Sequence, residues 1–256
     1  MTTSSKFVAL LDMLGFSAMV ANLDHQALHQ VYENMVGNAA LAISQGNFRT
    51  IETPLGRRSI ADISLASVRL VIFSDSVVIY SLNEGQRSFI DVCAAAGHMM
   101  VAGFYTGLPM RGGISFGLVT EFNATNAGVL GVHGVLGRPL VEAYLLEQGY
   151  RWAGCVVSDS AINQFEASPR AASEPVALSD LEQSGLLSRY GAPRKDGNNP
   201  DAWVINWPRL NRGGISSNAV HTSFLKHGKT ITTPDVERIV ENTMTFMRQS
   251  GAHLYD

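Results

Sequence analysis

Hydrophobic positions in the first third of the chain change from strand-like to helix-like spacing and back. An apolar run from Phe7 to Phe16 predicts a first strand, with Asp12 near its end. Apolar residues from Leu28 to Ile43 then recur every three or four positions, which predicts an amphipathic helix with Gly46 as its stop. The chain therefore begins with a strand followed by a helix that packs on a sheet.

The next segment predicts a hairpin and a second helix. The apolar run from Val68 to Tyr80 has Asp75 at its centre, as expected for two strands joined by a tight turn. The preceding stretch, from Asn47 to Asp62, contains Pro54, Gly56 and the pair Arg57-Arg58, and we interpret it as a loop. Helical spacing returns from Phe89 to Phe104 and predicts the second helix.

The remaining elements complete an α+β fold. In order they are a strand at Met110–Val119, a glycine-rich stretch at Gly128–Gly137, a helix at Pro139–Gln148, a strand at Trp152–Val157, a short helix starting at Ser158–Ser160, a strand at Ala202–Trp207 that closes the sheet, and a last helix opened by Thr233–Asp235. The order βαββαβ with C-terminal additions predicts a sandwich with a central sheet and helices on one face.

Composition and charge narrow the class of protein. The chain has 256 residues, of which 46% are hydrophobic and 16% charged, and no Pro/Ser-rich linker, so we expect one domain over 1–256. Its core spans about 7–207, with a C-terminal helical extension over about 208–256. The net charge of −3 argues against a nucleic-acid partner, whose phosphates require a basic face.

Cysteine usage and hydropathy predict a cytoplasmic protein. Cys93 and Cys155 lie in apolar surroundings without a paired-cysteine motif, which is typical of reduced thiols. Charged or polar residues interrupt every apolar stretch before the roughly 20 residues that a membrane span needs, so we expect no membrane partner. The polar residues before Phe7 are too few for a signal peptide.

Asp12 and Asp75 are the strongest candidates for chemistry because each interrupts an apolar strand. An ionised carboxylate that is buried without a partner costs several kcal/mol, so each requires a hydrogen-bonded partner or a cation. Carboxylate oxygens suit Mg²⁺ or Mn²⁺, whose coordination shell is often completed by substrate phosphates. The pair indicates a metal site for nucleotide chemistry. The alternatives are that Asp12 caps the following helix and that Asp75 is a turn residue.

Four motifs, in the same order, resemble those of the class III nucleotide cyclases. They are Asp12–Ser17 for D-I-x-G-F-[ST], Ser74-Asp75 for the tip of the central hairpin, Met110–Gly117 for M-R-x-G-I-x-x-G, and Gly137–Glu147 in the frame of G-x-x-V-N-x-A-x-R-L-E. The resemblance implies a class III cyclase-like fold with a central, mostly antiparallel sheet. The F-S-D-S hairpin and the M-R-G-G-I-S strand look most like the pyrimidine cyclases of Pycsar, a bacterial anti-phage system.

The departures from the family pattern concern the base and the transition state. Val71 and Gly134 occupy the positions of the lysine and aspartate that read adenine in the family. Val141 and Leu145 replace its transition-state asparagine and arginine. By resemblance, the expected activity is conversion of UTP to 3′,5′-cyclic UMP and pyrophosphate, with a separate effector that senses the product. The alternatives are a cytidylate cyclase that makes cyclic CMP and an inactive nucleotide-binding domain.

The resemblance also implies roles for particular residues. Asp12, Asp75 and the backbone carbonyl of Met13 would hold two divalent ions, Mn²⁺ or Mg²⁺, and Arg111 would bind phosphate or stabilise the transition state. The alternative for Arg111 is that it is a surface arginine on an edge strand. The family's active sites lie at a dimer interface, so a homodimer is implied.

The strand-to-helix turn after Asp12 is a candidate phosphate site. The backbone amides of Leu14, Gly15 and Phe16 would bind phosphate there. An ordinary tight turn at Gly15 and a core position for Phe16 are the alternatives. Weaker candidates, interpreted mostly as solvated charges, are Arg57, Arg58, Arg138, Arg194 and Lys195.

Overall fold

The structure, a computed structural model, describes residues 1–54, 56–126, 130–168, 176–211 and 214–251. Its centre is an eight-stranded sheet with the order β4-β5-β1-β6-β8-β10-β9, and β7 pairs with β6. The pair β6–β8 is parallel, and the other pairs of this sheet are antiparallel. The strands are β1 (Thr2–Met13), β4 (Val68–Phe73), β5 (Ser76–Ser81), β6 (Met110–Asn126), β7 (Leu130–Gly137), β8 (Cys155–Val157), β9 (Leu187–Gly191) and β10 (Asp201–Ile205).

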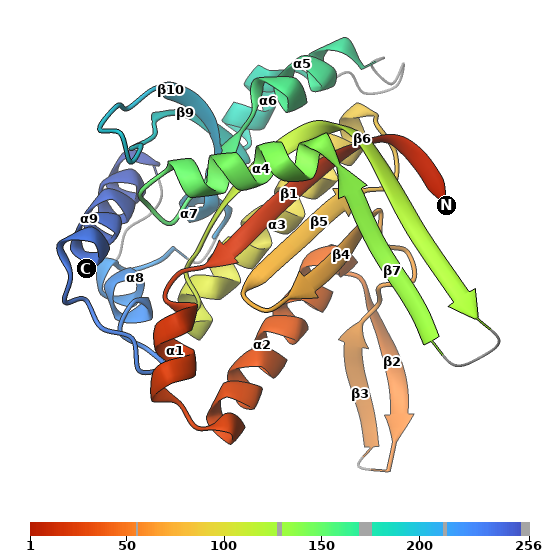
Figure 1. Cartoon of the computed structure of the whole chain (residues 1–256), viewed down its shortest axis with the longest axis horizontal. Helices are drawn as coiled ribbons and strands as arrows, with labels where there is room; N and C mark the ends of the chain where they lie inside the picture. Colours follow the sequence, from red (N-terminus) through yellow and green to blue (C-terminus); the bar gives the residue numbers. More distant parts are fainter. Residues whose placement is uncertain (55, 127–129, 169–175, 212–213, 252–256) are drawn as a thin grey trace.

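Helices cover both faces of this sheet (Figure 1). Helices α2 (His25–Ser44) and α3 (Gln86–Thr106) pack on one face, where Phe7 of β1 joins the main core. Helix α4 (Arg138–Gly149) crosses the other face, where Val8 packs in a smaller cluster. The expectation of helices on one face is therefore wrong. Strands β1 and β6 are central and buried on both faces, so their sequences lack the apolar–polar alternation that would show which face is covered by helices.

Helix α4 lies unusually close to β6 because glycine and serine face it. A Cβ atom on Gly113 would lie 2.5 Å from the Cβ of Leu146 and 2.6 Å from the carbonyl oxygen of Ala143. Ser115, two residues further along β6, donates a hydrogen bond from Oγ to the carbonyl of Pro139 over 2.6 Å. These contacts place the C-terminal end of α4 over the start of β6.

Most of the predicted elements are confirmed, and three are corrected. The segment 47–62 is not a loop but a separate hairpin, β2 (Phe48–Thr53) with β3 (Gly56–Ala61), which stands apart from the main sheet (Figure 1). Strand β8 is shorter than predicted. Strand β10 does not close the sheet, because β9 pairs with its outer edge. The glycine-rich stretch forms β7 from Leu130, while residues 128 and 129 lie outside the described residues.

The C-terminal part packs on the same core as the sheet. Trp207 stacks on Phe104 of α3 with ring centroids 4.1 Å apart, and Phe246 packs edge-on against Trp152 at 4.6 Å. The remaining helices are α1 (Phe16–Asn22), α5 (Asp159–Ala167), α6 (Leu178–Gln183), α7 (Trp207–Leu210), α8 (Ser217–Ser223) and α9 (Pro234–Gln249). Residues from β1 to α9 therefore share one hydrophobic cluster.

Helix α3 has the length and hydropathy of a membrane span, and it is the one such helix within the described ranges. It contacts β1, β5 and β6 as well as α2, and most of its apolar stretch is buried. The core helix of a water-soluble protein has the same features, so its composition is accounted for by packing on the sheet.

Candidate active site

Asp12 and Arg111 are cross-strand partners on the two central strands, β1 and β6. Arg111 Nη2 lies 3.6 Å from Asp12 Oδ2, and both side chains are largely buried, with exposed fractions of 14% and 19%. In an antiparallel pair, opposite residues project to the same face, so their side chains meet on the face that α4 covers. The alternative of a surface arginine on an edge strand is wrong, because β6 lies between β1 and β8.

Asp75 lies in the two-residue turn between β4 and β5, directly beside the end of β1. Its carbonyl accepts a hydrogen bond from the backbone N–H of Met13 over 3.0 Å, and Asp12 pairs with Ser76. Ser74, the other turn residue, has a left-handed φ of 55°. Asp75 is thus a turn residue, and the hairpin places it beside Asp12. The helix-capping alternative for Asp12 is wrong, because Asp12 is part of β1 and α1 begins after Gly15 without a side-chain cap.

Glu147 is a site residue that the sequence analysis quoted in a motif but did not single out. It lies near the end of α4 with 1% of its side chain exposed, and Arg111 donates a hydrogen bond from Nε to its Oε1. The contact exists only because α4 packs on the same face as Asp12 and Arg111. The sequence analysis expected all helices on one face of the sheet, so it gave no reason to bring Glu147 of α4 to Arg111 on the face opposite α2 and α3.

The site carries more negative charge than its arginine neutralises. Burial raises the pKa of Asp12 from 3.8 to about 7, and repulsion from Glu147 and then Asp75 adds to the rise against the opposing effect of Arg111. Asp12 and Glu147 therefore share one guanidinium, and Asp75 adds a third negative charge nearby. A cation at Asp12 and Asp75 would favour the ionised form of Asp12 and relieve this imbalance.

The donor set fits a magnesium or manganese ion that also binds phosphate. Within the part of the chain that the structure describes, no three metal-ligating side chains converge on one point, and Glu147 is turned toward Arg111. Mg²⁺ is commonly held by one or two carboxylates together with water and substrate phosphates. Two carboxylates on adjacent strand ends match that requirement without a third protein side chain.

The turn after Asp12 only partly matches the predicted phosphate site. The Leu14 amide donates to the carbonyl of Pro109 over 2.8 Å, so it is not a free donor and that part of the expectation is wrong. Gly15 adopts a left-handed φ of +83°, and a Cβ there would lie 2.6 Å from Cδ of Lys229. Phe16 is half-buried and packs against the core, as its alternative stated.

Three of the four positions where the chain departs from the cyclase motifs, Val71, Val141 and Leu145, lie on the α4 side of the sheet, whereas Gly134 pairs with Phe122 of β6. Val71 packs with Val78 and Leu140 in the small cluster on that face. Val141 and Leu145 are 57% and 63% exposed on α4. Together with Arg138 they line an open cavity of about 610 Å³ between α4 and β6.

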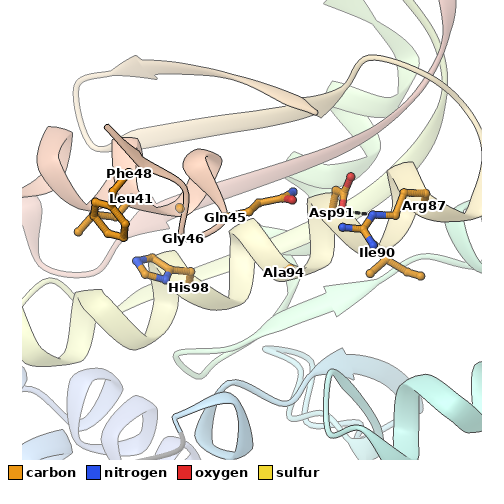
Figure 2. A pocket seen from close by; sticks show the side chains of 10 residues that line it. Leu41, Gln45, Gly46, Phe48, Arg87, Ile90, Asp91, Ala94 and His98 are labelled. Atoms are coloured by element: carbon orange, nitrogen blue, oxygen red, sulfur yellow. Dashed lines mark ion pairs between the residues drawn. The ribbon is translucent and has the colours of Figure 1, made fainter. Parts of the chain in front are cut away.

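A second cavity lies elsewhere and does not contain the acidic pair. It has a volume of about 440 Å³ and lies between the end of α2, the start of β2 and α3. Figure 2 shows the ion pair of Arg87 with Asp91 toward one end of the lining and His98 toward the other. Neither Asp12 nor Asp75 lines this cavity or the larger one between α4 and β6, so cavity size does not locate the candidate chemistry.

The weaker basic candidates are exposed. Arg57 pairs with Glu52 across the β2–β3 hairpin, and Arg194 pairs with Asp196 at 3.3 Å. Arg58 and Lys195 are also exposed. None of these four contacts Asp12 or Asp75 through an ion pair or hydrogen bond in the described part of the chain.

Comparisons with known proteins assign the fold. No family model matches the chain, and no curated protein sequence matches it. Two structures of bacterial light-regulated adenylyl cyclases are similar, each at 11% identity. One has a TM-score of 0.51 over 97% of this chain and 58% of its own, and the other a TM-score of 0.50 over 98% and 100%.

A third similar structure is the catalytic core of a rhodopsin-guanylyl cyclase with converted specificity in complex with ATPαS. It is 10% identical, with a TM-score of 0.50 over 80% of this chain and 97% of its own. At these identities the similarity shows the fold alone. The fold is that of the class III nucleotide cyclases, with a mostly antiparallel central sheet and helices, as the motifs predicted.

Proposed function

We propose that this protein is a nucleotide cyclase that converts UTP to 3′,5′-cyclic UMP and pyrophosphate. The observation that carries the proposal is the buried, under-neutralised Asp12 beside Asp75, with Arg111 as its cross-strand partner, in a cyclase fold. In this reaction the ribose 3′-oxygen attacks the α-phosphorus, the bond from that phosphorus to the bridging oxygen breaks, and pyrophosphate leaves. The 3′-hydroxyl gives up its proton to solvent water.

The residues of the site have distinct roles in this proposal. Asp12, Asp75 and the Met13 carbonyl hold two divalent ions, and Gly15 and Phe16 contribute backbone amides near the triphosphate. A bound Mg²⁺ or Mn²⁺ lowers the pKa of the 3′-hydroxyl and neutralises phosphate charge. Arg111 uses Nε and Nη2 for Glu147 and Asp12, so the N–H donors that these contacts do not use are available for a phosphate oxygen.

Glu147 orients Arg111 in this arrangement. Its buried carboxylate fixes the guanidinium plane at the base of the site through Nε, so the remaining donors have a defined direction. A preoriented guanidinium requires no reorganisation when charge develops on the α-phosphate, which is how fixed donors contribute most to catalysis.

A pyrimidine base is proposed because the purine-reading pair is replaced. Val71 is apolar and packed, and glycine at position 134 has no side chain to read a base. The hairpin and the β6 motif resemble those of uridylate cyclases in the Pycsar anti-phage system. We therefore place the protein in the bacterial cytoplasm, where a separate effector would sense cyclic UMP. Cyclic CMP from CTP is the alternative product.

We also propose a homodimer with its active sites at the interface, built from one domain over residues 1–256. The exposed apolar residues Val141, Tyr144 and Leu145 on α4, and Leu118 on β6, support it, because exposed apolar clusters mark association surfaces. The cavity beside Arg138 lies on this surface. Light scattering of the purified protein at several concentrations measures the state directly.

The test is incubation of purified protein with Mn²⁺ and ATP, GTP, CTP or UTP separately, with products identified by chromatography and mass spectrometry. We expect cyclic UMP from UTP. Asp75→Asn should reduce turnover at least about 100-fold, because it removes a metal carboxylate while preserving the size of the side chain. Asp62→Asn, at a partly exposed aspartate outside the site, is the control.

Val141 and Leu145 favour a second candidate, a nucleotide-binding domain without turnover, because both positions lack the family's polar transition-state groups. Binding of UTP with no cyclic product from any of the four nucleotides would support it. Full activity in Asp75→Asn would show instead that the metal assignment is wrong.

A further inference from the structure

Three basic side chains from one short turn bind the end of α3. The turn lies between α8 and α9, and we name residues Lys226 to Lys229 the basic clamp. The hydrogen bonds run from Lys226 Nζ to the carbonyl of Tyr105 at 2.9 Å, between His227 Nε2 and the carbonyl of Thr106 at 2.6 Å, and from Lys229 Nζ to the carbonyl of Gly107 at 2.6 Å. The last carbonyls of a helix lack intrahelical partners, and cations are favoured there.

Lys229 extends from the clamp to the turn that follows Asp12. Its side chain is buried, and a Cβ atom on Gly15 would lie 2.6 Å from its Cδ and 3.2 Å from its Cγ. The lysine stem thus covers Gly15 at the start of α1. The clamp also contacts the other end of α1, where Asn22 Nδ2 donates to the carbonyl of Gly228 over 2.7 Å.

The clamp contacts the chain next to both strands that carry the candidate site. Gly15 follows Asp12 by three residues, and Gly107 precedes Arg111 by four. The hydrogen bond from the Leu14 amide to the Pro109 carbonyl joins the same two segments. Lys229 therefore contacts both the segment after the end of β1 and the segment before the start of β6, within three or four residues of Asp12 and Arg111.

Burying the Lys229 ammonium group costs folding free energy, and a residue that only filled space would not require that group. Among the described residues no carboxylate lies within ion-pair distance of it, and its acceptor is a neutral carbonyl. Burial and then the neighbouring Lys226 lower its pKa from 10.5 to about 7. An apolar side chain of similar length would fill the same space without burying an ammonium group.

We propose that Lys229 is a positioning residue, which fixes the turn after Asp12 against the segment that leads into Arg111. The inference rests on the proposed function, because it assigns Lys229 a role in keeping the metal-binding carboxylates in register with Arg111. The basic clamp belongs to the C-terminal extension, so the extension contributes to the geometry of a site that lies wholly in the core.

The test compares Lys229→Met with Lys226→Met. Methionine keeps the apolar stem over Gly15 and removes the ammonium, while Lys226 is exposed and its hydrogen bond ends on Tyr105. The first readout is amide hydrogen exchange in metal-free protein, which is independent of activity. We expect faster exchange at Leu14 and across 107–111 in Lys229→Met, and wild-type exchange at Leu14 in Lys226→Met.

The second readout is the Mn²⁺ concentration that gives half-maximal turnover, together with Mn²⁺ binding by electron paramagnetic resonance. Lys229→Met should raise that concentration by about 10-fold, the size of effect expected when a ligand loses its support. Lys226→Met should stay within about twofold of wild type. If Lys229→Met does not fold, Lys229→Gln, which keeps a neutral N–H donor, should shift both readouts in the same direction.

Equal exchange at Leu14 and equal Mn²⁺ dependence in the two variants would overturn the inference. Failure of the proposed function gives a different result, because wild-type protein would then cyclise none of the four nucleotides. The exchange comparison still decides in that case whether Lys229 holds the turn.

Discussion

Arg111 lies opposite Asp12 in the β1–β6 pair, with Nη2 3.6 Å from Oδ2, and this pairing connects the Asp12 carboxylate to the packing of α4. The same guanidinium donates a hydrogen bond from Nε to Glu147 of α4. Because both partners are mostly buried, the charges are poorly screened by solvent and each strongly affects the others. The stability and the chemistry of the site therefore depend on one arginine.

Replacing Arg111 by glutamine should destabilise the fold by about 3–5 kcal/mol, because it leaves the buried Glu147 carboxylate without its charged partner. Urea unfolding measures the change. Arg57→Gln is the matched control, since its ion pair with Glu52 is exposed and such pairs contribute at most about 1 kcal/mol. Equal unfolding midpoints for the two variants would show that Glu147 does not depend on Arg111.

How far the sequence predicts this site depends on which contacts are local. Asp12 and Asp75 stand out because a carboxylate inside an apolar strand is costly wherever the strand lies. Their meeting at one strand end follows from the resemblance and the hairpin. The role of Glu147 requires α4 on a particular face, and both faces of β1 and β6 are apolar. Hydrophobic periodicity therefore does not show which face of the sheet α4 covers.

The β2–β3 hairpin and Lys229 show the same limit in other ways. Strands β2 and β3 have mostly exposed side chains and little apolar alternation, so turn-forming residues suggested a loop. Lys229 reaches Gly15 across more than 200 positions of the chain. In the sequence it is one lysine among polar residues, and only its burial reveals a role.

Gly113→Ala should destabilise the protein by about 1–3 kcal/mol, because the new methyl group would overlap Leu146 and the carbonyl of Ala143 and push α4 away from β6. Thermal unfolding measures this change. Gly37→Ala in α2 is the control with the opposite sign. Nothing lies within 4 Å of a Cβ there, so alanine should stabilise the helix by up to about 1 kcal/mol. Two variants of equal stability would contradict the close approach of α4.

Cys93 and Cys155 should be unreactive in the folded protein. Both are fully buried, and burial raises the pKa of each thiol above its ordinary value, so little thiolate exists at neutral pH. We expect a disulfide reagent to modify both thiols in denaturant and neither in native protein, as absorbance would report. Rapid modification of a native thiol would show that the core around α3 and β8 opens.

Asp12→Asn should stabilise the metal-free protein at pH 8 while abolishing Mn²⁺ binding and turnover. The pKa of Asp12 is raised from 3.8 to about 7, so its contribution to stability is complete below about pH 4 and is lost as the pH rises through 7. The full difference corresponds to up to about 4 kcal/mol. Asparagine carries no charge and avoids that loss.

Thermal unfolding in a chelator, from pH 5 to 8, measures the difference between Asp12→Asn and wild type. The stability advantage of the variant should grow as the pH rises. Asp62→Asn is the contrasting control: hydrogen bonds from Ser64 lower the pKa of Asp62 from 3.8, so its ionised form favours the folded state above about pH 4, and the variant should be less stable than wild type by an amount that stays constant from pH 5 to 8. A difference for Asp12→Asn that does not change with pH would mean that the Asp12 carboxylate is already neutralised in the metal-free protein, so the charge imbalance would no longer support a cation at this site.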